Sequence, residues 1–199
     1  MRLGAIILAG GRSSRMGRPK DSLPFGATTL LGHVAGTLAS CTAPVVIVAR
    51  DAQQVLPPLP AGCELAHDER PGEGPLSALA TGLRRLQGRA DAALLAACDQ
   101  PFWSAAAVRW LLAQLGTAPL VMPSAGGELQ PLAAIYRVDL LPHVDAMVAR
   151  GVRSPRDLAA LPAARTLAEA DVRAFDPELR FLQNVNTPAD YDAARARRD

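Results

Sequence analysis

Short apolar segments alternate with longer segments of helical periodicity along the first 120 residues. Runs of apolar residues predict strands at residues 5–9, 45–49 and 92–97, with a weaker strand at 63–67. Apolar positions spaced three and four residues apart predict helices at 29–40, 76–86 and 104–115. Because strands and helices take turns, we expect an α/β fold of three layers, in which a mostly parallel, mixed sheet has helices on both faces.

The alternation is less regular after residue 120. It predicts strands at 120–122, 131–137 and 180–185, and helices at 138–150 and 155–161. A closing helix is predicted at 189–197, because Thr187 can cap it, Pro188 suits a first helical position and Asp190 gives a capping-box pattern. Segments 53–61 and 163–180 are expected to be loops. We expect one domain over residues 1–199, a length sufficient to bury a core without disulfides or a metal.

Charge and hydropathy narrow the classes of function. The chain has 21 basic and 19 acidic residues, a net charge of +2 that argues against nucleic acid or an anionic membrane as the main partner. No apolar run approaches the roughly 20 residues of a membrane span, and the first residues do not resemble a targeting segment. We therefore expect a cytoplasmic protein. Cys41, Cys63 and Cys98 form no CxxC pair, so we expect them to be small buried apolar side chains.

Two residue types are scarce enough to direct attention to single positions. Lys20 is the only lysine among the 21 basic residues, and Asn184 and Asn186 are the only asparagines. Where arginine is used everywhere else, a lysine suggests a site that needs a compact charge on a flexible stem, such as one that follows a phosphate group. Two asparagines at alternate positions of a strand would share one face and offer donors and acceptors to a heterocycle or a phosphate. A pair of Asx turns is the alternative interpretation.

A basic, glycine-rich loop follows the first predicted strand. Residues 8–20 read LAGGRSSRMGRPK, with four cations and no acid before Asp21. Glycines let backbone N–H groups approach an anion, and ligands of open α/β sheets lie beyond the carboxyl ends of strands, so a phosphate ligand is expected. The spacing fits neither GxxxxGK[ST] nor GxGxxG, which argues against P-loop NTPases and nicotinamide dehydrogenases. A basic surface turn is the alternative.

Two acids follow predicted strands. Asp99 comes just after the strand at 92–97, where its carboxylate is placed to hold Mg²⁺ opposite a phosphate loop; a turn or capping residue is the alternative. Asp68 follows the strand at 63–67 and opens a stretch rich in turn-forming residues, so a binding role and a turn role are equally compatible with its position.

The loop pattern LAGGxSxRMGxxK resembles the signature loop of nucleotidyltransferases built like sugar-nucleotide pyrophosphorylases, and most closely that of the molybdenum cofactor guanylyltransferases. The resemblance continues in the order of the family through GPL at 74–76, CDQP at 98–101, QPL at 130–132 and NVNTP at 184–188. It covers essentially the whole chain.

The resemblance implies transfer of GMP from GTP to the terminal phosphate of molybdopterin, with pyrophosphate as the leaving group. It implies an N-terminal half that binds nucleotide and a C-terminal half that binds molybdopterin, with Mg²⁺ as cofactor and Asp99 as its ligand. The implied nucleotide-binding residues are Leu8, Ala9, Gly10, Gly11, Arg15, Lys20, Asp68 and Asp99, of which Arg15, Lys20 and Asp99 are the catalytic ones. The implied molybdopterin-binding residues are Gln130, Arg153, Asn184 and Asn186. Expected partner proteins are other proteins of molybdenum cofactor biosynthesis and the recipient molybdoenzymes.

One geometric expectation follows from these two sets of residues. If both substrates share a single active-site cleft, Lys20 and Asn186 must lie on the same side of the fold.

Two departures from the guanylyltransferase pattern leave the choice of base open to an alternative. Pro19 stands where these enzymes more often have Asp, and residues 48–50 read VAR where the family has an Asn-containing end of the second strand. A CTP-dependent molybdopterin cytidylyltransferase is the first alternative, although such enzymes usually have LAAG and lack NxNTP. A sugar-1-phosphate nucleotidyltransferase usually has further domains. A catalytically silent nucleotide-binding regulator is the remaining alternative, against which the presence of both Lys20 and Asp99 argues.

Overall fold

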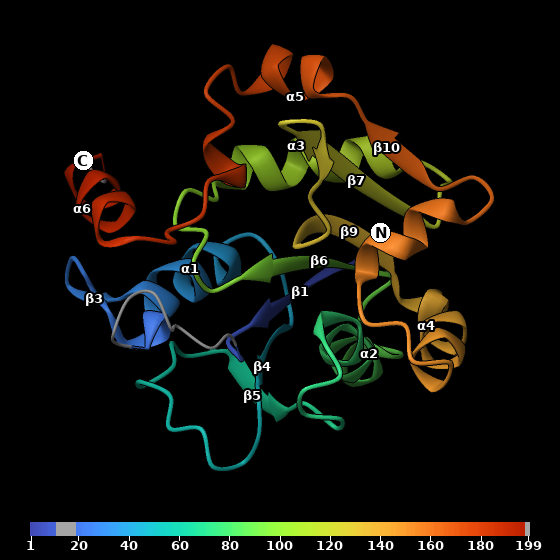
Figure 1. Cartoon of the computed structure of the whole chain (residues 1–199), viewed down its shortest axis with the longest axis horizontal. Coiled ribbons are helices and arrows are strands. Elements are labelled where there is room, and N and C mark those ends of the chain that lie inside the picture. The colour runs from blue at the N-terminus through green and yellow to red at the C-terminus, as the bar shows by residue number, and fades with distance from the viewer. Residues whose placement is uncertain (11–18, 198–199) are drawn as a thin grey trace.

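The structure of the chain, a computed structural model, describes residues 1–10 and 19–197. Within this part, an eight-stranded sheet forms the middle layer, with strands in the order β10-β7-β9-β6-β1-β4-β5 and β8 paired with β7 (Figure 1). The strands are β1 Leu3–Leu8, β4 Val45–Ala49, β5 Cys63–His67, β6 Ala92–Ala97, β7 Leu120–Ala125, β8 Glu128–Leu129, β9 Ala133–Arg137 and β10 Arg165–Leu167.

The direction of the strands makes the sheet mixed, as the sequence predicts. β1 pairs in parallel with β4 and β6, and β4 with β5, whereas β9 runs antiparallel to both β6 and β7. Of these strands, β1, β4 and β6 are apolar and buried on both faces, so they need helices on both sides. Their carboxyl ends therefore meet at one edge of the sheet, between the two helical layers.

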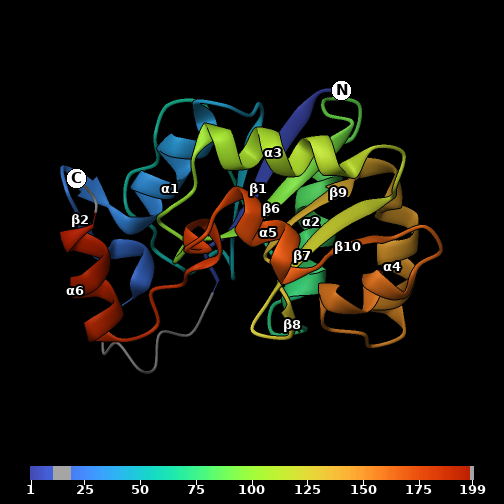
Figure 2. The ribbon, with the colours of Figure 1, turned by 90° about the horizontal axis from the view of Figure 1, so that it is seen from above.

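Helices cover both faces of the sheet (Figure 2). They bury two separate hydrophobic cores. The helices are α1 Leu30–Ala39, α2 Pro75–Leu86, α3 Ala105–Leu115, α4 Leu141–Ala149, α5 Glu169–Phe175 and α6 Pro188–Ala196. Alternation along β1 shows the division: Ile7 packs into the core under α1 and α3, while Ile6 packs into the core under α2 and α4. The predicted three-layer α/β fold is confirmed.

Helix starts follow the predicted capping chemistry. The Ser104 side chain accepts the N–H of Ala107 at the start of α3, and Thr187 forms a complete capping box with Asp190 at the start of α6. Among the cysteines, Cys98 is buried as expected, but Cys41 and Cys63 are only half-buried. No helix in the described part of the chain is long and apolar enough to cross a membrane.

The strand predicted at residues 180–185 is wrong. The chain forms a 3-10 turn there, η4 (Arg180–Leu182), and then an extended segment outside the sheet. The N–H of Phe181 donates to the Asp176 carboxylate, and the N–H of Val185 donates to the Asp99 carbonyl, so neither is available to a ladder. The apolar side chains of this segment fill the core from a loop instead.

The loop predicted at 163–180 is also wrong in part, because it contains β10 and α5. Both elements are short and bury few side chains: Leu167 in β10 and Val172 in α5. Such short elements carry too little periodicity to predict. Two predicted helices are modified as well, since 155–161 is the 3-10 helix η3 (Pro155–Ala160), and 138–150 begins as a 3-10 turn, η2 (Val138–Leu140), before α4.

A small hairpin that the sequence pattern did not predict follows Lys20. The 3-10 turn η1 (Lys20–Ser22) leads into β2 (Pro24–Phe25), which pairs with β3 (Thr28–Thr29) just before α1. Phe25 and Leu23 pack with Val185 and Ala194 in a third, smaller core. This core joins the segment after Lys20 to the C-terminal region.

Candidate functional site

The carboxyl ends of β1, β4 and β6 are tied together by backbone hydrogen bonds just past the last paired residues. The N–H of Ala9 donates to the Val48 carbonyl over 2.9 Å, and the N–H of Cys98 donates to the Leu8 carbonyl over 3.1 Å. Leu8 is half-buried and Ala9 is buried. Gly10 is the last described residue before the gap; Gly11 and Arg15, which the sequence predicts to bind phosphate, lie outside the described residues.

Lys20 joins two of the predicted binding regions. Its Nζ lies 2.8 Å from Asp99 Oδ2 and 2.8 Å from Asn186 Oδ1. The side chains of Lys20 and Asp99 are 16% and 18% exposed, so water reaches the ion pair but screens it only in part. The expectation that Lys20 and Asn186 lie on one side of the fold is confirmed.

The segment that carries Asn186 is held by its own backbone. The N–H of Val185, a residue 1% exposed, donates to the Asp99 carbonyl over 2.9 Å. The N–H groups of Asn186 and Thr187 both donate to Asp190 Oδ2. Asn184 and Asn186 are exposed on either side of buried Val185, and the segment is not a strand.

Asp68 has structural partners. Its Oδ1 accepts the hydroxyl of Ser77 over 2.6 Å and the N–H of Arg70 over 3.0 Å, an Asx-type turn that ties the loop after β5 to α2. The turn interpretation of Asp68 therefore describes its conformation in this structure.

Arg153 lies against the start of α2. Its carbonyl accepts the N–H of Leu76 over 3.0 Å, which satisfies one of the free donors at that helix end. A Cβ on Gly74 would lie 2.7 Å from this carbonyl oxygen and 2.8 Å from Arg153 Cβ, so the GPL motif permits a close approach of the two segments. The backbone of Arg153, whose side chain is exposed, thus lies against the loop that Asp68 opens.

Gln130 holds the turn between β7 and β8. Its amide group donates to the Glu128 carbonyl over 3.2 Å and, more weakly, to the Ala125 carbonyl over 3.4 Å. The residue is half-buried, at the same end of the sheet as Asp99, because Ala133 pairs with Ala96. The Gln130 amide thus bonds within its own turn, whereas Asn186 bonds Lys20 directly.

The described residues are compatible with a divalent cation that is bound by the protein and the nucleotide together. No group of three or more His, Cys, Asp or Glu side chains that could hold a metal forms among residues 1–10 and 19–197. Asp99 supplies a hard oxygen ligand, and Mg²⁺ in nucleotide sites is typically held by one or two carboxylates together with substrate phosphates. Asp99 fits this role if the nucleotide supplies further oxygens. Burial raises the pKa of the neighbouring Cys98 thiol, so Cys98 stays protonated and is a poor nucleophile.

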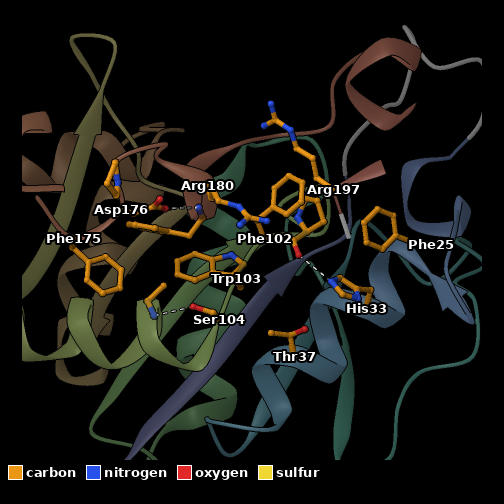
Figure 3. Close-up of a pocket in the computed structure, with 14 residues that line it drawn as sticks. Phe25, His33, Thr37, Phe102, Trp103, Ser104, Phe175, Asp176, Arg180 and Arg197 are labelled. Atoms are coloured by element: carbon orange, nitrogen blue, oxygen red, sulfur yellow. Dashed lines mark hydrogen bonds between the residues drawn. The ribbon is translucent and has the colours of Figure 1, made fainter. Parts of the chain in front are cut away.

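An aromatic cavity of about 430 Å³ lies between α1 and the start of α3 (Figure 3). Arg180 lies over the Phe102 ring, 5.4 Å from its centroid, and the buried indole N–H of Trp103 has no hydrogen-bond partner in the described part of the chain. None of the predicted nucleotide- and molybdopterin-binding residues that the structure describes lines this cavity. It is therefore separate from the cluster around Lys20.

Sequence reasoning missed two residues beside the loop. Asp21 is buried at 4% exposure, and Gln54 bonds its carboxylate from within segment 53–61, which was correctly expected to lack helix and strand. Gln54 lies in a loop of ordinary composition and gave no signal. Asp21 gave none either, because its burial, which makes a partner for the carboxylate necessary, is visible only in the folded chain.

Comparison with known proteins agrees with the fold and the motifs. Residues 5–168 match the family model described as MobA-like NTP transferase domain. The chain is 40% identical over 204 residues to a probable molybdenum cofactor guanylyltransferase of Mycobacterium avium, covering 99% of this chain and 98% of the relative. A protein of the same description from Mycobacterium tuberculosis is 37% identical, with 96% and 92% covered.

Solved structures show the same fold at lower identity. The molybdopterin-guanine dinucleotide biosynthesis protein A of Archaeoglobus fulgidus has a TM-score of 0.75 at 21% identity, with 97% of each chain covered. The 2-C-methyl-D-erythritol 4-phosphate cytidylyltransferase of Thermus thermophilus has a TM-score of 0.68 at 15% identity, with 96% of each chain covered. With the family model matched over most of its length and relatives similar from end to end, the chain belongs to the MobA-like NTP transferase family.

Proposed function

We propose that this chain transfers GMP from GTP to the terminal phosphate of molybdopterin, forming molybdopterin guanine dinucleotide and releasing pyrophosphate. The observation that carries the proposal is the contact of Lys20 with both Asp99 and Asn186, which joins the predicted nucleotide side to the predicted molybdopterin side at one point. The names of the full-length relatives point to the same reaction.

The reaction asks for positioning and charge neutralisation rather than for covalent catalysis. A phosphate oxygen of molybdopterin attacks the α-phosphorus of GTP in line, a new P–O bond forms, and the bond to pyrophosphate breaks. The attacking oxygen is already anionic, so no general base is required. In this proposal Lys20 and Arg15 neutralise the negative charges of the phosphates, which come close to one another in the transition state.

Asp99 is the proposed ligand for a divalent cation, which is Mg²⁺ in our proposal. When bound, such an ion offsets the charge on the leaving pyrophosphate. One solved structure of the same fold, from Mycobacterium tuberculosis, is described as a complex with manganese, with a TM-score of 0.63 and 18% identity. Because Lys20 already contacts Asp99 Oδ2, the lysine and the metal would share this carboxylate.

We further propose a single domain with two functional halves. In the N-terminal half, Leu8, Ala9, Gly10, Gly11, Arg15, Lys20, Asp68 and Asp99 serve the nucleotide. In the C-terminal half, Gln130, Arg153, Asn184 and Asn186 serve molybdopterin. The ion-paired Lys20 would then act at the boundary between the two substrates.

GTP is the proposed nucleotide and CTP the alternative. The relatives that are 37–40% identical are described as guanylyltransferases, whereas the cytidylyltransferase with the same fold is only 15% identical. The NVNTP segment also follows the guanylyltransferase pattern. We place the protein in the cytoplasm, with proteins of molybdenum cofactor biosynthesis and recipient molybdoenzymes as its partners.

Thermal unfolding with GTP, CTP or ATP, each with Mg²⁺, tests the nucleotide, because a ligand that binds only the folded state raises the Tm. We expect the largest rise with GTP. Pyrophosphate release with GTP and molybdopterin then tests the reaction. A larger rise with CTP supports the cytidylyltransferase alternative, a nucleotide-dependent rise without pyrophosphate release supports a silent regulator, and no rise with any nucleotide contradicts the proposal.

A further inference from the structure

A single side-chain amide, that of Gln54, joins three segments around the predicted phosphate loop. Its Nε2 donates to the Ala9 carbonyl over 2.8 Å and to Asp21 Oδ2 over 3.0 Å, and its Oε1 accepts the N–H of Arg50 over 2.8 Å. Both amide hydrogens and the amide oxygen are therefore used. Ala9 lies at the start of the loop, directly before Gly10, whereas Asp21 directly follows Lys20 and Arg50 follows the end of β4.

The bond to Asp21 is made to a carboxylate that has little access to water. Asp21 is 4% exposed, and its other oxygen accepts the Ser22 hydroxyl over 2.7 Å. A buried carboxylate is costly unless donors surround it, so Gln54 and Ser22 together make this position possible. Because Asp21 and Lys20 share the short turn η1, the bond that holds Asp21 also limits where the Lys20 backbone can lie.

The bond to Arg50 acts on the other end of the loop. A Cβ on Gly10 would lie 3.2 Å from Arg50 Cα and 3.3 Å from Arg50 N, so Gly10 passes close to this backbone. Gln54 binds the same backbone N–H and also the carbonyl just before Gly10. Gly10 is therefore held between the backbone just past the end of β4 and the Gln54 side chain.

We propose that Gln54 is a positioning residue for the nucleotide. By fixing the Ala9 and Asp21 ends of the loop to each other and to the end of β4, it sets the distance between the Gly10 backbone and Lys20, which are proposed to bind the phosphates of one nucleotide. The inference rests on the proposed function of this loop. Displacement of reacting groups by about 1 Å can cost on the order of 100-fold in rate, so a bond remote from the reacting atoms can matter to turnover.

The test uses the isosteric variant Gln54→Glu in the full chain. It can still accept the Arg50 N–H, but it loses both donors and places a second carboxylate beside Asp21. We expect the KM for GTP to rise about tenfold or more and kcat to fall, as loop geometry is lost. Gln53→Glu is the matched control, since it adds the same charge one residue earlier at an exposed side chain; its kinetic constants should stay within about twofold.

A compensating variant separates positioning from general stability. In Gln54→Glu with Asp21→Asn, the amide at position 21 can donate to the carboxylate at position 54, which restores one bond and removes the like-charge contact. We expect this double variant to recover part of the lost GTP affinity. Gln54→Asn, neutral but one methylene shorter, is the second variant should Gln54→Glu not fold, and its KM for GTP should also rise.

Two results would overturn the inference. One is a folded Gln54→Glu or Gln54→Asn protein with wild-type KM and kcat; the other is a lowered Tm with unchanged kinetic constants, which would mean a purely structural role. Failure of GTP, CTP and ATP to stabilise the wild-type protein is a different result, because it contradicts the proposed function rather than the role of Gln54.

Discussion

Lys20 and Asn186 are 166 residues apart in the chain, and their side chains are joined by a 2.8 Å hydrogen bond from Nζ to Oδ1. Lys20 is the only lysine of the protein and Asn186 one of two asparagines. The same ammonium group holds Asp99, so the residues proposed to bind two different substrates share one charge. Substitutions at these positions should therefore be coupled rather than independent.

We predict that Asn186→Ala lowers turnover about tenfold, and that it has a much smaller effect in a Lys20→Ala background. Residues that share a hydrogen bond typically show coupling energies of about 0.5–3 kcal/mol in a double-mutant cycle. Pyrophosphate release by the four proteins gives this energy. Asn184→Ala is the control for coupling: it removes a neighbouring exposed amide but keeps the bond from Lys20 Nζ to Asn186 Oδ1, so it should lower turnover by the same factor in the wild-type and Lys20→Ala backgrounds. Effects of Asn186→Ala and Lys20→Ala that simply multiply would contradict a shared role.

Lys20→Ala alone should reduce turnover by about 100-fold or more while the protein stays folded. Removal of one preorganised group that stabilises transition-state charge typically costs on the order of 10²–10³ in kcat. The measurement is kcat for pyrophosphate release, with the Tm recorded beside it. Arg150→Ala, which removes an exposed cation after α4, should leave kcat unchanged. Near-normal turnover of a folded Lys20→Ala protein would remove Lys20 from the mechanism.

The central sheet was predictable because its signal is local and strong. Apolar runs at β1, β4 and β6 need burial on both faces whatever surrounds them, and the Ser104 and Thr187 caps depend only on neighbouring residues. The segment at 180–185 was not predictable in the same way. Its apolar residues suit a strand, but the Asp99 carbonyl and the Asp176 carboxylate accept the N–H groups that a strand would need.

The sequence predicted which residues form the candidate site, but it did not predict all the contacts that these residues make. Motif spacing identified Lys20, Asp99 and Asn186, and the fold brings these three together. It could not show that Asp68 is held by Ser77, or that Gln54 bonds three segments, because both depend on how loops pack rather than on sequence spacing. Side-chain amides in loops have many possible partners, and tertiary structure selects among them.

We predict that Mg²⁺ binds well only together with nucleotide. Asp99 Oδ2 is engaged by Lys20, and the described part of the chain offers no cluster of three acidic, Cys or His side chains for an ion on its own. Millimolar Mg²⁺ alone should leave the Tm unchanged, GTP with Mg²⁺ should raise it, and EDTA should remove most of that rise. Asp99→Asn should abolish the metal-dependent part. A rise with Mg²⁺ alone as large as that with GTP and Mg²⁺ would contradict this coupling.

Gly74→Ala should weaken the use of molybdopterin. Gly74 has a φ of 98°, and an added Cβ would meet the Arg153 backbone, so Arg153 must move. Gly72→Ala is a matched control, since its φ of 86° is similarly unfavourable for alanine but nothing lies within 4 Å of the new Cβ. We expect Gly72→Ala to lose about 1–2 kcal/mol of stability, Gly74→Ala to lose more because of the clash, and only Gly74→Ala to raise the KM for molybdopterin. Equal KM values for molybdopterin in the two variants would mean that Arg153 does not bind molybdopterin.

The acid at the start of α6 should make stability depend on pH. Hydrogen bonds from the backbone N–H groups of Thr187 and Asn186 hold the pKa of Asp190 below its ordinary value. The folded state thus releases this proton more readily than the unfolded one, so the ionised carboxylate stabilises the fold above the unfolded pKa of about 3.9. This contribution is lost as the pH falls through the lower, folded pKa.

Urea unfolding of wild-type protein and Asp190→Asn, compared at several pH values, measures this contribution. At pH 7 we expect wild type to be more stable by up to about 1 kcal/mol, a modest value because the carboxylate is near solvent. The difference should shrink steadily below about pH 4, where the unfolded state begins to take up the proton. Asp192→Asn, which removes the same charge from an exposed position of the same helix, is the matched control. Since Asp190 also accepts the Asn186 N–H, Asp190→Asn should in addition lower turnover slightly. If the difference in unfolding free energy between wild type and Asp190→Asn does not change with pH, the charge of Asp190 contributes nothing to holding this segment.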